Sequence, residues 1–249
     1  MRPGAVRASS HRHGFDKHSA RAGALGLWSL VFAWLWLSGE MTRYLGPRTF
    51  WVAPFGAVAL GGAAAVTAAG ARRSSDRDEL SAGDGARFGV LLLPLVAMLA
   101  VPGAQLGSQA AANKAPSGIL VGAAAAAPGA PGSGPIGFRD IYYAGQSERY
   151  ALERGLSDGM GVNLTGFITH PPGIPEGFFA LTRFYVSCCA ADAIPYSVVV
   201  RPPGPVVPSA YPDDRWLEIG GQLGQSDAGF MLFPHSIKPA KAPDDPYLY

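Results

Sequence analysis

Long apolar runs alternate with short polar segments over the first hundred residues of the chain. Ala22 to Gly39 and Thr49 to Ala71 contain no charged residue. As a helix the first run is roughly 27 Å long, close to the bilayer core of about 30 Å. A third run, Phe88 to Pro102, is shorter and contains Pro94. The pattern predicts a transmembrane region over 22–102, with helices at about 22–42, 49–71 and 86–102.

Two alternatives apply to these runs. A basic segment before an apolar run is also typical of a secretory signal peptide. Because no small-x-small cleavage site follows Ser38, we expect a retained helix. The third run also fits a re-entrant or interfacial segment.

The distribution of charge predicts the orientation in the membrane. Basic residues fill 1–21 and recur between the second and third runs, at Arg72, Arg73, Arg77 and Arg87. Cytoplasmic loops carry an excess of Lys and Arg. We therefore predict a multi-pass protein of the cell membrane, with residues 1–21 as a basic cytoplasmic tail and the chain after Pro102 outside the cytoplasm.

The pattern changes again after Pro102. Residues 103–135 are rich in Ala, Gly and Pro and are expected to form a flexible linker. Residues 136–249 contain short runs typical of strands, separated by Pro, Gly and Asp clusters. These runs are Gly137–Tyr143, Gly161–His170, Phe178–Cys189, Tyr196–Arg201, Arg215–Leu223 and Gly229–Ile237, with a short helix at Gln146–Leu156. The predicted fold class is an α-helical transmembrane region of about three helices followed by an extracytoplasmic, mainly-β domain, an OB-like small barrel.

Composition narrows the function classes. Charged residues make up 15% of the chain, against roughly 25% in an ordinary soluble domain, which agrees with membrane segments. The net charge of +2 gives no reason to expect a nucleic-acid partner. The chain has none of the common catalytic motifs, such as a P-loop, Gly-x-Ser-x-Gly or HExxH, so we do not expect an enzyme.

Both cysteines of the chain, Cys188 and Cys189, are adjacent at the end of a strand-like run. One interpretation is that a cysteine fills core space. A second is a strained vicinal disulfide, since adjacent Cα atoms lie only about 3.8 Å apart, below the usual range for a disulfide. A third is a site for Zn or another soft metal, with Asp192, His170 or His235 as further ligands. Asp192 is also a candidate cap for a helical turn beginning near Ala193.

The segment Arg183-Phe-Tyr-Val-Ser-Cys-Cys-Ala-Ala-Asp192 resembles the YcgQ-like family of bacterial membrane proteins, whose function is largely uncharacterised. Gly161–Phe167, with Gly166, and the segment that begins at Asp214 and contains Trp216 are similar to other parts of that family. The terminus Pro243–Tyr249 is also similar to it. The resemblance implies pairing with a multi-span permease, and it marks Arg183, Phe184, Trp216 and Gly166 as parts of a structural motif.

Three hypotheses follow. The first is an accessory subunit of a permease whose outer domain binds a metal or small ligand near the double cysteine. The second is a structural or assembly subunit without a ligand. The third is an extracytoplasmic thiol-redox protein. In each case the lipid bilayer is an expected partner.

Overall fold

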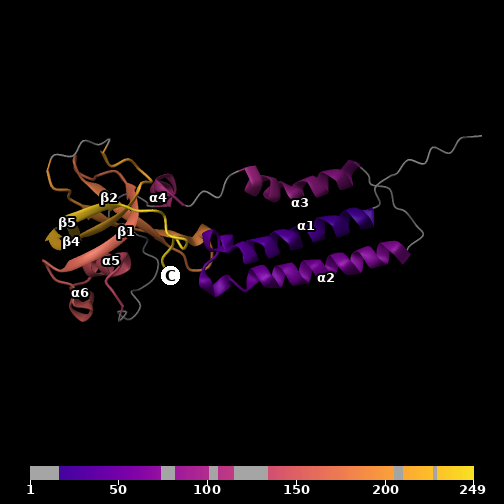
Figure 1. The fold of residues 1–249 in the computed structure, drawn as a ribbon, viewed down its shortest axis with the longest axis horizontal. Helices are drawn as coiled ribbons and strands as arrows, with labels where there is room; N and C mark the ends of the chain where they lie inside the picture. Colours follow the sequence, from indigo (N-terminus) through magenta and orange to yellow (C-terminus); the bar gives the residue numbers. More distant parts are fainter. Residues whose placement is uncertain (1–16, 74–81, 101–105, 115–133, 205–209, 227–228) are drawn as a thin grey trace, which may run out of the picture. The chain divides into compact units, whose positions relative to one another are not determined.

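The computed structural model describes residues 17–73, 82–100, 106–114, 134–204, 210–226 and 229–249 (Figure 1). The chain divides into two compact units. One contains Met1–Met41 and Trp51–Gly103, and the other contains Thr42–Phe50 and Ala104–Tyr249. The loop that joins the first two helices therefore belongs to the second unit, although both helices belong to the first.

The first unit contains three long helices, α1 (Lys17–Ser38), α2 (Val52–Arg73) and α3 (Ala82–Ala100). Small residues bring α1 and α2 close together. A Cβ added at Gly56 would lie 3.2 Å from the ring of Phe32, and one added at Gly61 would lie 2.9 Å from Ser29 Oγ. Ser29 Oγ also donates to the carbonyl of Ala57 at 2.7 Å. Close approach at small residues and hydrogen bonds between helices are typical of membrane helix pairs.

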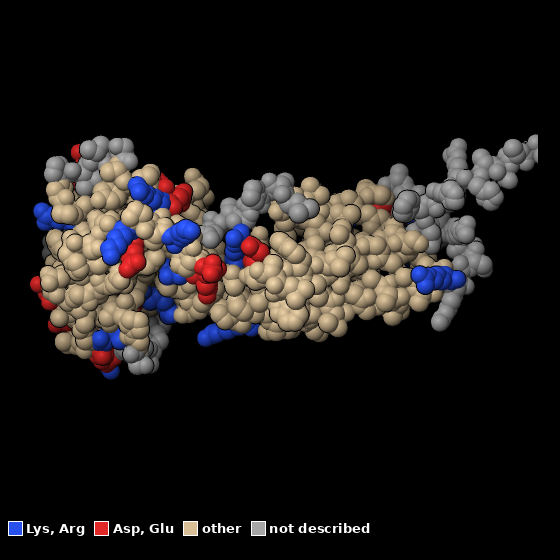
Figure 2. Space-filling model, viewed as in Figure 1, with Lys and Arg blue, Asp and Glu red and all other residues tan. Residues whose placement is uncertain are grey.

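The outer surface of this helical unit is apolar, and Figure 2 shows few charged side chains along it. Large side chains are exposed on all three helices: Leu27, Leu30, Trp34, Trp36, Leu37, Phe55, Val58, Val66, Val90, Leu91, Leu93 and Val96. In water a patch of this size is exceptional. Two segments of the described chain, Lys17–Ser38 and Pro47–Arg72, are long and apolar enough to cross a bilayer. Two of the predicted apolar helices are thus present and are long enough to span a membrane, whereas the crossing itself stays a prediction. The helix α3 is present and contains Pro94, but it lies outside that pair.

The second unit is built on a closed barrel of five strands in the order β1-β2-β3-β5-β4. The strands are β1 (Gly161–Thr169), β2 (Phe179–Tyr185), β3 (Ile194–Val200), β4 (Trp216–Ser226) and β5 (Gly229–Pro239). All neighbouring pairs are antiparallel except β3 and β5, which are parallel. The prediction of a small β-barrel is confirmed.

The strand predicted at Gly137–Tyr143 is wrong, because this segment is the helix α5 (Phe138–Gln146). The backbone N–H of Gly137 donates to Asp140 Oδ2 at 2.9 Å, which caps the first turn. Phe138, Ile141 and Ala144 are all buried, at the spacing of one helical face. A second helix, α6 (Glu148–Arg154), follows at once, and Ser147 caps its N-terminus.

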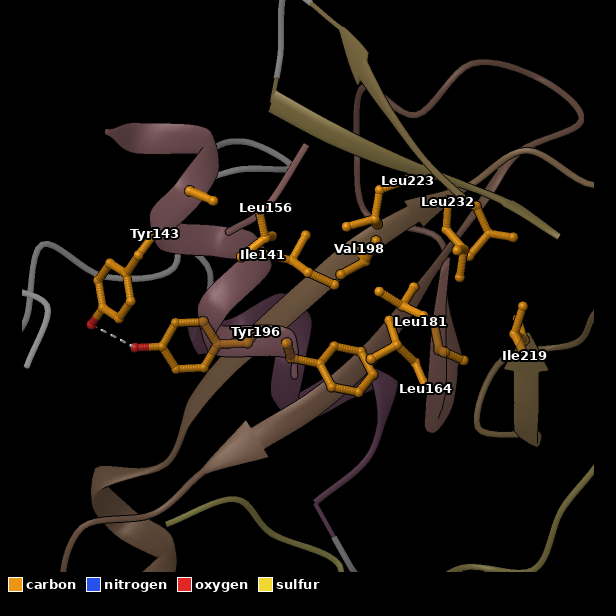
Figure 3. Packing of buried hydrophobic residues seen from close by; sticks show 14 of the residues in the cluster. Ile141, Tyr143, Leu156, Leu164, Leu181, Tyr196, Val198, Ile219, Leu223 and Leu232 are labelled. Atoms are coloured by element: carbon orange, nitrogen blue, oxygen red, sulfur yellow. Dashed lines mark hydrogen bonds between the residues drawn. The ribbon is translucent and has the colours of Figure 1, made fainter. Parts of the chain in front are cut away.

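The barrel unit contains two clusters of buried side chains. The larger cluster combines the barrel interior with α5 and α6, and Figure 3 shows its aliphatic side chains converging between the strands. The smaller cluster includes Phe167, Phe184, Val186 and Tyr247. Because β1 contributes to both clusters, its last four residues are buried on both faces.

A short helix, α4 (Ser108–Lys114), lies inside the segment expected to be a linker. Its first residue donates to the Asp214 carboxylate from both its backbone N–H and its hydroxyl, the latter at 2.9 Å. Ala111 is buried in the smaller cluster, and Lys114 Nζ donates to the carbonyl of Ala191 at 2.8 Å. Residues 106–114 therefore form part of the barrel unit. Most of the expected linker, 115–133, lies outside the described residues, as does most of the expected basic tail.

Candidate functional site

The double cysteine lies just beyond β2 and not within a strand. The strand ends at Tyr185, four residues before the predicted end. Val186, the next residue, no longer pairs with β3. Its N–H donates instead to the carbonyl of Leu248 in the C-terminal segment, at 2.9 Å. The two cysteines are therefore not part of the strand that the sequence predicted to end at Cys189.

The Asp192 carboxylate fixes the turn that holds the two cysteines. Its Oδ1 accepts the N–H of Ser187 at 3.1 Å, and its Oδ2 accepts the N–H of Cys188 at 2.8 Å. Asp192 is the last residue of the short 3-10 helix η3 (Ala190–Asp192), and β3 begins two residues later. The expected cap of a helical turn beginning near Ala193 is wrong, because the carboxylate reaches back toward the preceding turn.

The two thiols are adjacent and free. Their Sγ atoms are 3.8 Å apart, with Cys188 exposed and Cys189 half-buried. The bond to Asp192 and then the neighbouring Cys189 raise the pKa of Cys188 to about 11. Burial alone would raise the pKa of Asp192, but hydrogen bonds from the Cys188 thiol and from backbone N–H groups lower it below its ordinary value. At neutral pH Cys188 is therefore a thiol, whereas nucleophilic attack and metal binding need the thiolate.

The histidines are not gathered with the cysteines into a metal centre. His170 follows β1, and its Nδ1 hydrogen-bonds Asp213 Oδ1 at 2.9 Å. His235 is exposed on β5, where its Nε2 lies 3.2 Å from the point that a Cβ on Gly220 would occupy. Within the described ranges, no group of three or more His, Cys, Asp and Glu side chains is arranged to hold a metal ion. The structure therefore lends no support to the expected Zn or other soft-metal site.

The backbone of the double-cysteine turn binds the loop between α1 and α2, which we call the hairpin loop (Thr42–Phe50). Leu45 and Cys189 form an antiparallel β-bridge. The carbonyl of Cys188 accepts the N–H of Gly46 at 2.9 Å and the hydroxyl of Thr49 at 2.6 Å. The N–H of Ala190 donates to the carbonyl of Tyr44 at 2.8 Å. The double-cysteine turn and the hairpin loop thus pair like two short antiparallel strands within the barrel unit.

The C-terminal residues complete the same region. Leu248 donates its N–H to the carbonyl of Phe184 at 2.7 Å. The guanidinium of Arg183 donates to the carbonyls of Asp245 at 2.8 Å and Pro246 at 3.2 Å. The hydroxyl of Tyr247 donates to the carbonyl of Arg43 at 3.0 Å, which links the terminus to the hairpin loop.

The remaining motif residues support this region through the smaller cluster and through β1. Phe184 is buried and stacks on Phe167 with ring centroids 5.8 Å apart, and Trp216 packs on the same ring at 5.7 Å. A Cβ on Gly166 would lie 2.7 Å from the carbonyl oxygen of Thr182, so β1 and β2 can approach only because this position has no side chain.

Sequence reasoning missed the hairpin loop as part of the site. The contacts join residues about 140 positions apart through backbone groups, and such pairing leaves no periodicity in either segment. One available signal was Gly46-Pro47, a turn-forming pair in an otherwise short connection. A Cβ on Gly46 would lie 2.9 Å from the carbonyl oxygen of Ser187.

Comparison with known proteins found one similarity, and it covers the barrel and the two helices before it. No curated protein matches the chain. Residues 138–249 match a family model described as the DUF1980 C-terminal domain, an uncharacterised family. The match covers α5, α6, the barrel and the double cysteine, and it supplies neither an activity nor a partner. Residues 138–249 of the barrel unit are therefore similar to the DUF1980 C-terminal domain.

Proposed function

We propose that the chain is a non-enzymatic, membrane-anchored accessory subunit of a permease, whose barrel is held outside the cytoplasm by the hairpin loop. The observation that carries the membrane part of this proposal is the membership of Thr42–Phe50 in the barrel unit. The loop is joined at both ends to helices that are long and apolar enough to span a bilayer. A barrel bound to it is tethered at the membrane surface.

The same observation supports a third crossing. If α1 and α2 both span, the hairpin loop lies on the side opposite the N-terminus, and the end of α2 returns to the N-terminal side. The barrel follows α3 in the chain and binds the hairpin loop. The chain must therefore cross once more between α2 and α4, and α3 is the helix described there. Its exposed Val90, Leu93 and Val96 suit contact with lipid.

The barrel is best assigned to the OB-like class. It has five strands in a closed arrangement with one parallel pair, β3 and β5, which fits a small Greek-key barrel. The helices α5 and α6 precede β1 in the chain, and the short 3-10 helix η3 lies between β2 and β3.

We assign the double-cysteine turn a structural role in this arrangement. Its carbonyl and N–H groups bind the hairpin loop, and Asp192 holds its shape. The raised pKa of Cys188 opposes thiol-redox chemistry, because a thiol attacks a disulfide only as its thiolate. A purely structural or assembly subunit is the second candidate, since the same contacts serve it equally well.

Cross-linking tests the docking of the hairpin loop. Residues opposite each other in an antiparallel pair have Cα atoms about 4.5–5.5 Å apart, within the range of about 4.4–6.8 Å that a disulfide needs. The change Leu45→Cys, in a Cys188→Ser background with a protease site placed within 115–133, should form a disulfide with Cys189 in membranes. After cleavage the two halves should then run as one band on a non-reducing gel.

The matched control places the new cysteine at another position of the same loop. Arg48→Cys, in the same background, puts an exposed residue three positions away. Equal cross-linking from positions 45 and 48, or none from position 45, would refute the docked arrangement and with it the third crossing.

The permease rests on the family resemblance and needs its own test. The full chain, tagged and solubilised in a mild detergent, should purify with a multi-span membrane protein in fixed stoichiometry, as measured by native mass spectrometry. A chain that purifies alone, or only with copies of itself, would favour the assembly subunit and refute the accessory subunit.

A further inference from the structure

Arg139 is a half-buried cation without a carboxylate partner in the described chain. It lies in the first turn of α5, where its guanidinium carbon is 4.2 Å from the ring centroid of Tyr185 and 6.0 Å from that of Tyr143. No ion pair of Arg139 is found in the part of the chain that the structure describes. Its Nε is buried and has no hydrogen-bond partner among those residues.

The carboxylate that follows Arg139 in the chain is already paired. Asp140 accepts hydrogen bonds from Arg154 Nε at 2.9 Å, from the N–H of Gly137 at 2.9 Å and from the hydroxyl of Tyr150 at 3.0 Å. The charge of Asp140 is therefore balanced by Arg154 and does not balance that of Arg139. A cation in the first turn of a helix is also unfavourable next to the positive end of the helix dipole.

Tyrosines surround this cation. The hydroxyls of Tyr143 and Tyr196 are 3.1 Å apart, and Figure 3 shows the two rings pointing toward each other at the edge of the core. Tyr142 packs edge-on against Tyr196 with centroids 5.2 Å apart. Burial first, and then the bond to Tyr143, raise the pKa of Tyr196, so this hydroxyl keeps its proton at neutral pH.

The tyrosines compensate this cation only in part, through their ring faces and through contacts of the guanidinium with the hydroxyls of Tyr143 and Tyr196. A cation–π contact contributes about 0.5–2 kcal/mol, whereas removing a charge from water costs several. Buried polar atoms without a partner are rare in native proteins, and a bound ion or ligand can supply the missing acceptor. The guanidinium fork matches the paired oxygens of a carboxylate or phosphate.

We propose that Arg139, with the hydroxyls of Tyr143 and Tyr196, forms a binding site for a small oxyanion, the carboxylate or phosphate group of a ligand. The site lies within the barrel unit and involves neither the double cysteine nor the membrane helices. The proposal of this anion site is therefore independent of the proposed accessory role.

Thermal unfolding of the full chain in detergent tests the site. The Tm should rise and saturate with sodium phosphate or sodium acetate, above the change caused by sodium chloride at equal ionic strength. Arg139→Gln should weaken the apparent affinity at least tenfold, because it removes the charge and the fork. Arg149→Gln is the matched control, since Arg149 lies on α6, is exposed and pairs only with Glu153 at 2.7 Å among the described residues. A response to phosphate alone or to acetate alone would support the site and assign the ligand group.

Two results would overturn the proposal. One is a response to both anions that equals the response to chloride. The other is an Arg139→Gln chain that still responds like the wild type. If Arg139→Gln does not fold, Tyr196→Phe decides, because it keeps the ring and removes one donor. It should weaken anion binding about two- to tenfold, and an unchanged affinity would refute the site.

Discussion

The bond between Asp192 and Cys188 predicts that the exposed thiol reacts slowly. Asp192 raises the pKa of Cys188 from 9.0 to about 11 together with Cys189. At pH 8 the thiolate fraction is then about a hundredfold smaller than for an ordinary cysteine. A thiolate of higher pKa is more nucleophilic. With a Brønsted coefficient of about 0.4–0.5, each thiolate reacts roughly six- to tenfold faster, which offsets part of the loss in thiolate fraction. Alkylation of Cys188 should therefore be about tenfold slower than that of an unperturbed thiol.

The perturbation is Asp192→Asn in a Cys189→Ser background, where Cys188 is the only cysteine of the chain. The assay is the rate of alkylation by iodoacetamide between pH 7 and 11, followed by mass spectrometry of the full chain. Because Asp192 is the largest cause of the shift, the Cys189→Ser parent should keep a midpoint well above 9.0. Asp192→Asn should lower that midpoint toward 9.0 and raise the rate at pH 8.

The shape of the profile separates the electrostatic effect from a loosened turn. Asp192 also accepts the N–H groups of Ser187 and Cys188, so its replacement weakens the turn as well. A looser turn would raise the rate by the same factor at every pH, whereas loss of the carboxylate moves the midpoint. A midpoint near 9.0 in the parent, or one that Asp192→Asn leaves in place, would refute the reasoning.

Two further predictions concern stability. Gly166→Ala should destabilise the barrel by about 1–3 kcal/mol, because its Cβ would lie 2.7 Å from the Thr182 carbonyl, and chemical denaturation would measure it. Gly161→Ala on the same strand meets nothing within 4 Å and should change little. Burial alone would raise the pKa of Asp140, but hydrogen bonds from Arg154, Gly137 and Tyr150 together lower it below 3.8. The contribution of Asp140 to stability is therefore present above pH 3.8 and is lost as the pH falls through the lowered value. Asp140→Asn should flatten the acid limb of a plot of unfolding free energy against pH, and an unchanged limb would contradict this.

The parts of the fold that follow from local periodicity were predictable. In β1 the alternation of Val162, Leu164, Gly166 and Ile168 predicted one buried face, and all four are buried. The strand continues to bury both faces at its end because Phe167 enters the second cluster. The burial of that second face depends on Phe184 and Trp216, which are distant in sequence. The local pattern of β1 therefore could not predict it.

The helix α5 shows why a local reading can fail. Its segment is rich in aromatic and β-branched residues, which favour strands. The capping contact between Gly137 and Asp140 and the burial of Phe138 and Ile141 on one face favour a helix instead. Arg154 strengthens this choice from α6 by binding Asp140 at 2.9 Å, a tertiary contact that the sequence does not display.

In the sequence the double cysteine is a candidate site because of its thiols, whereas in the structure its contacts to the hairpin loop are made by the backbone. Cys188 offers its carbonyl to Gly46 and Thr49, and its N–H to Asp192. Serine in place of either cysteine would leave these groups where they are. Asp192 has less freedom, because its two carboxylate oxygens accept two separate N–H groups of the turn. In the docking of the hairpin loop, the positions that tolerate little change are therefore Asp192, which holds the turn, and Gly46, where a Cβ would lie 2.9 Å from the Ser187 carbonyl oxygen.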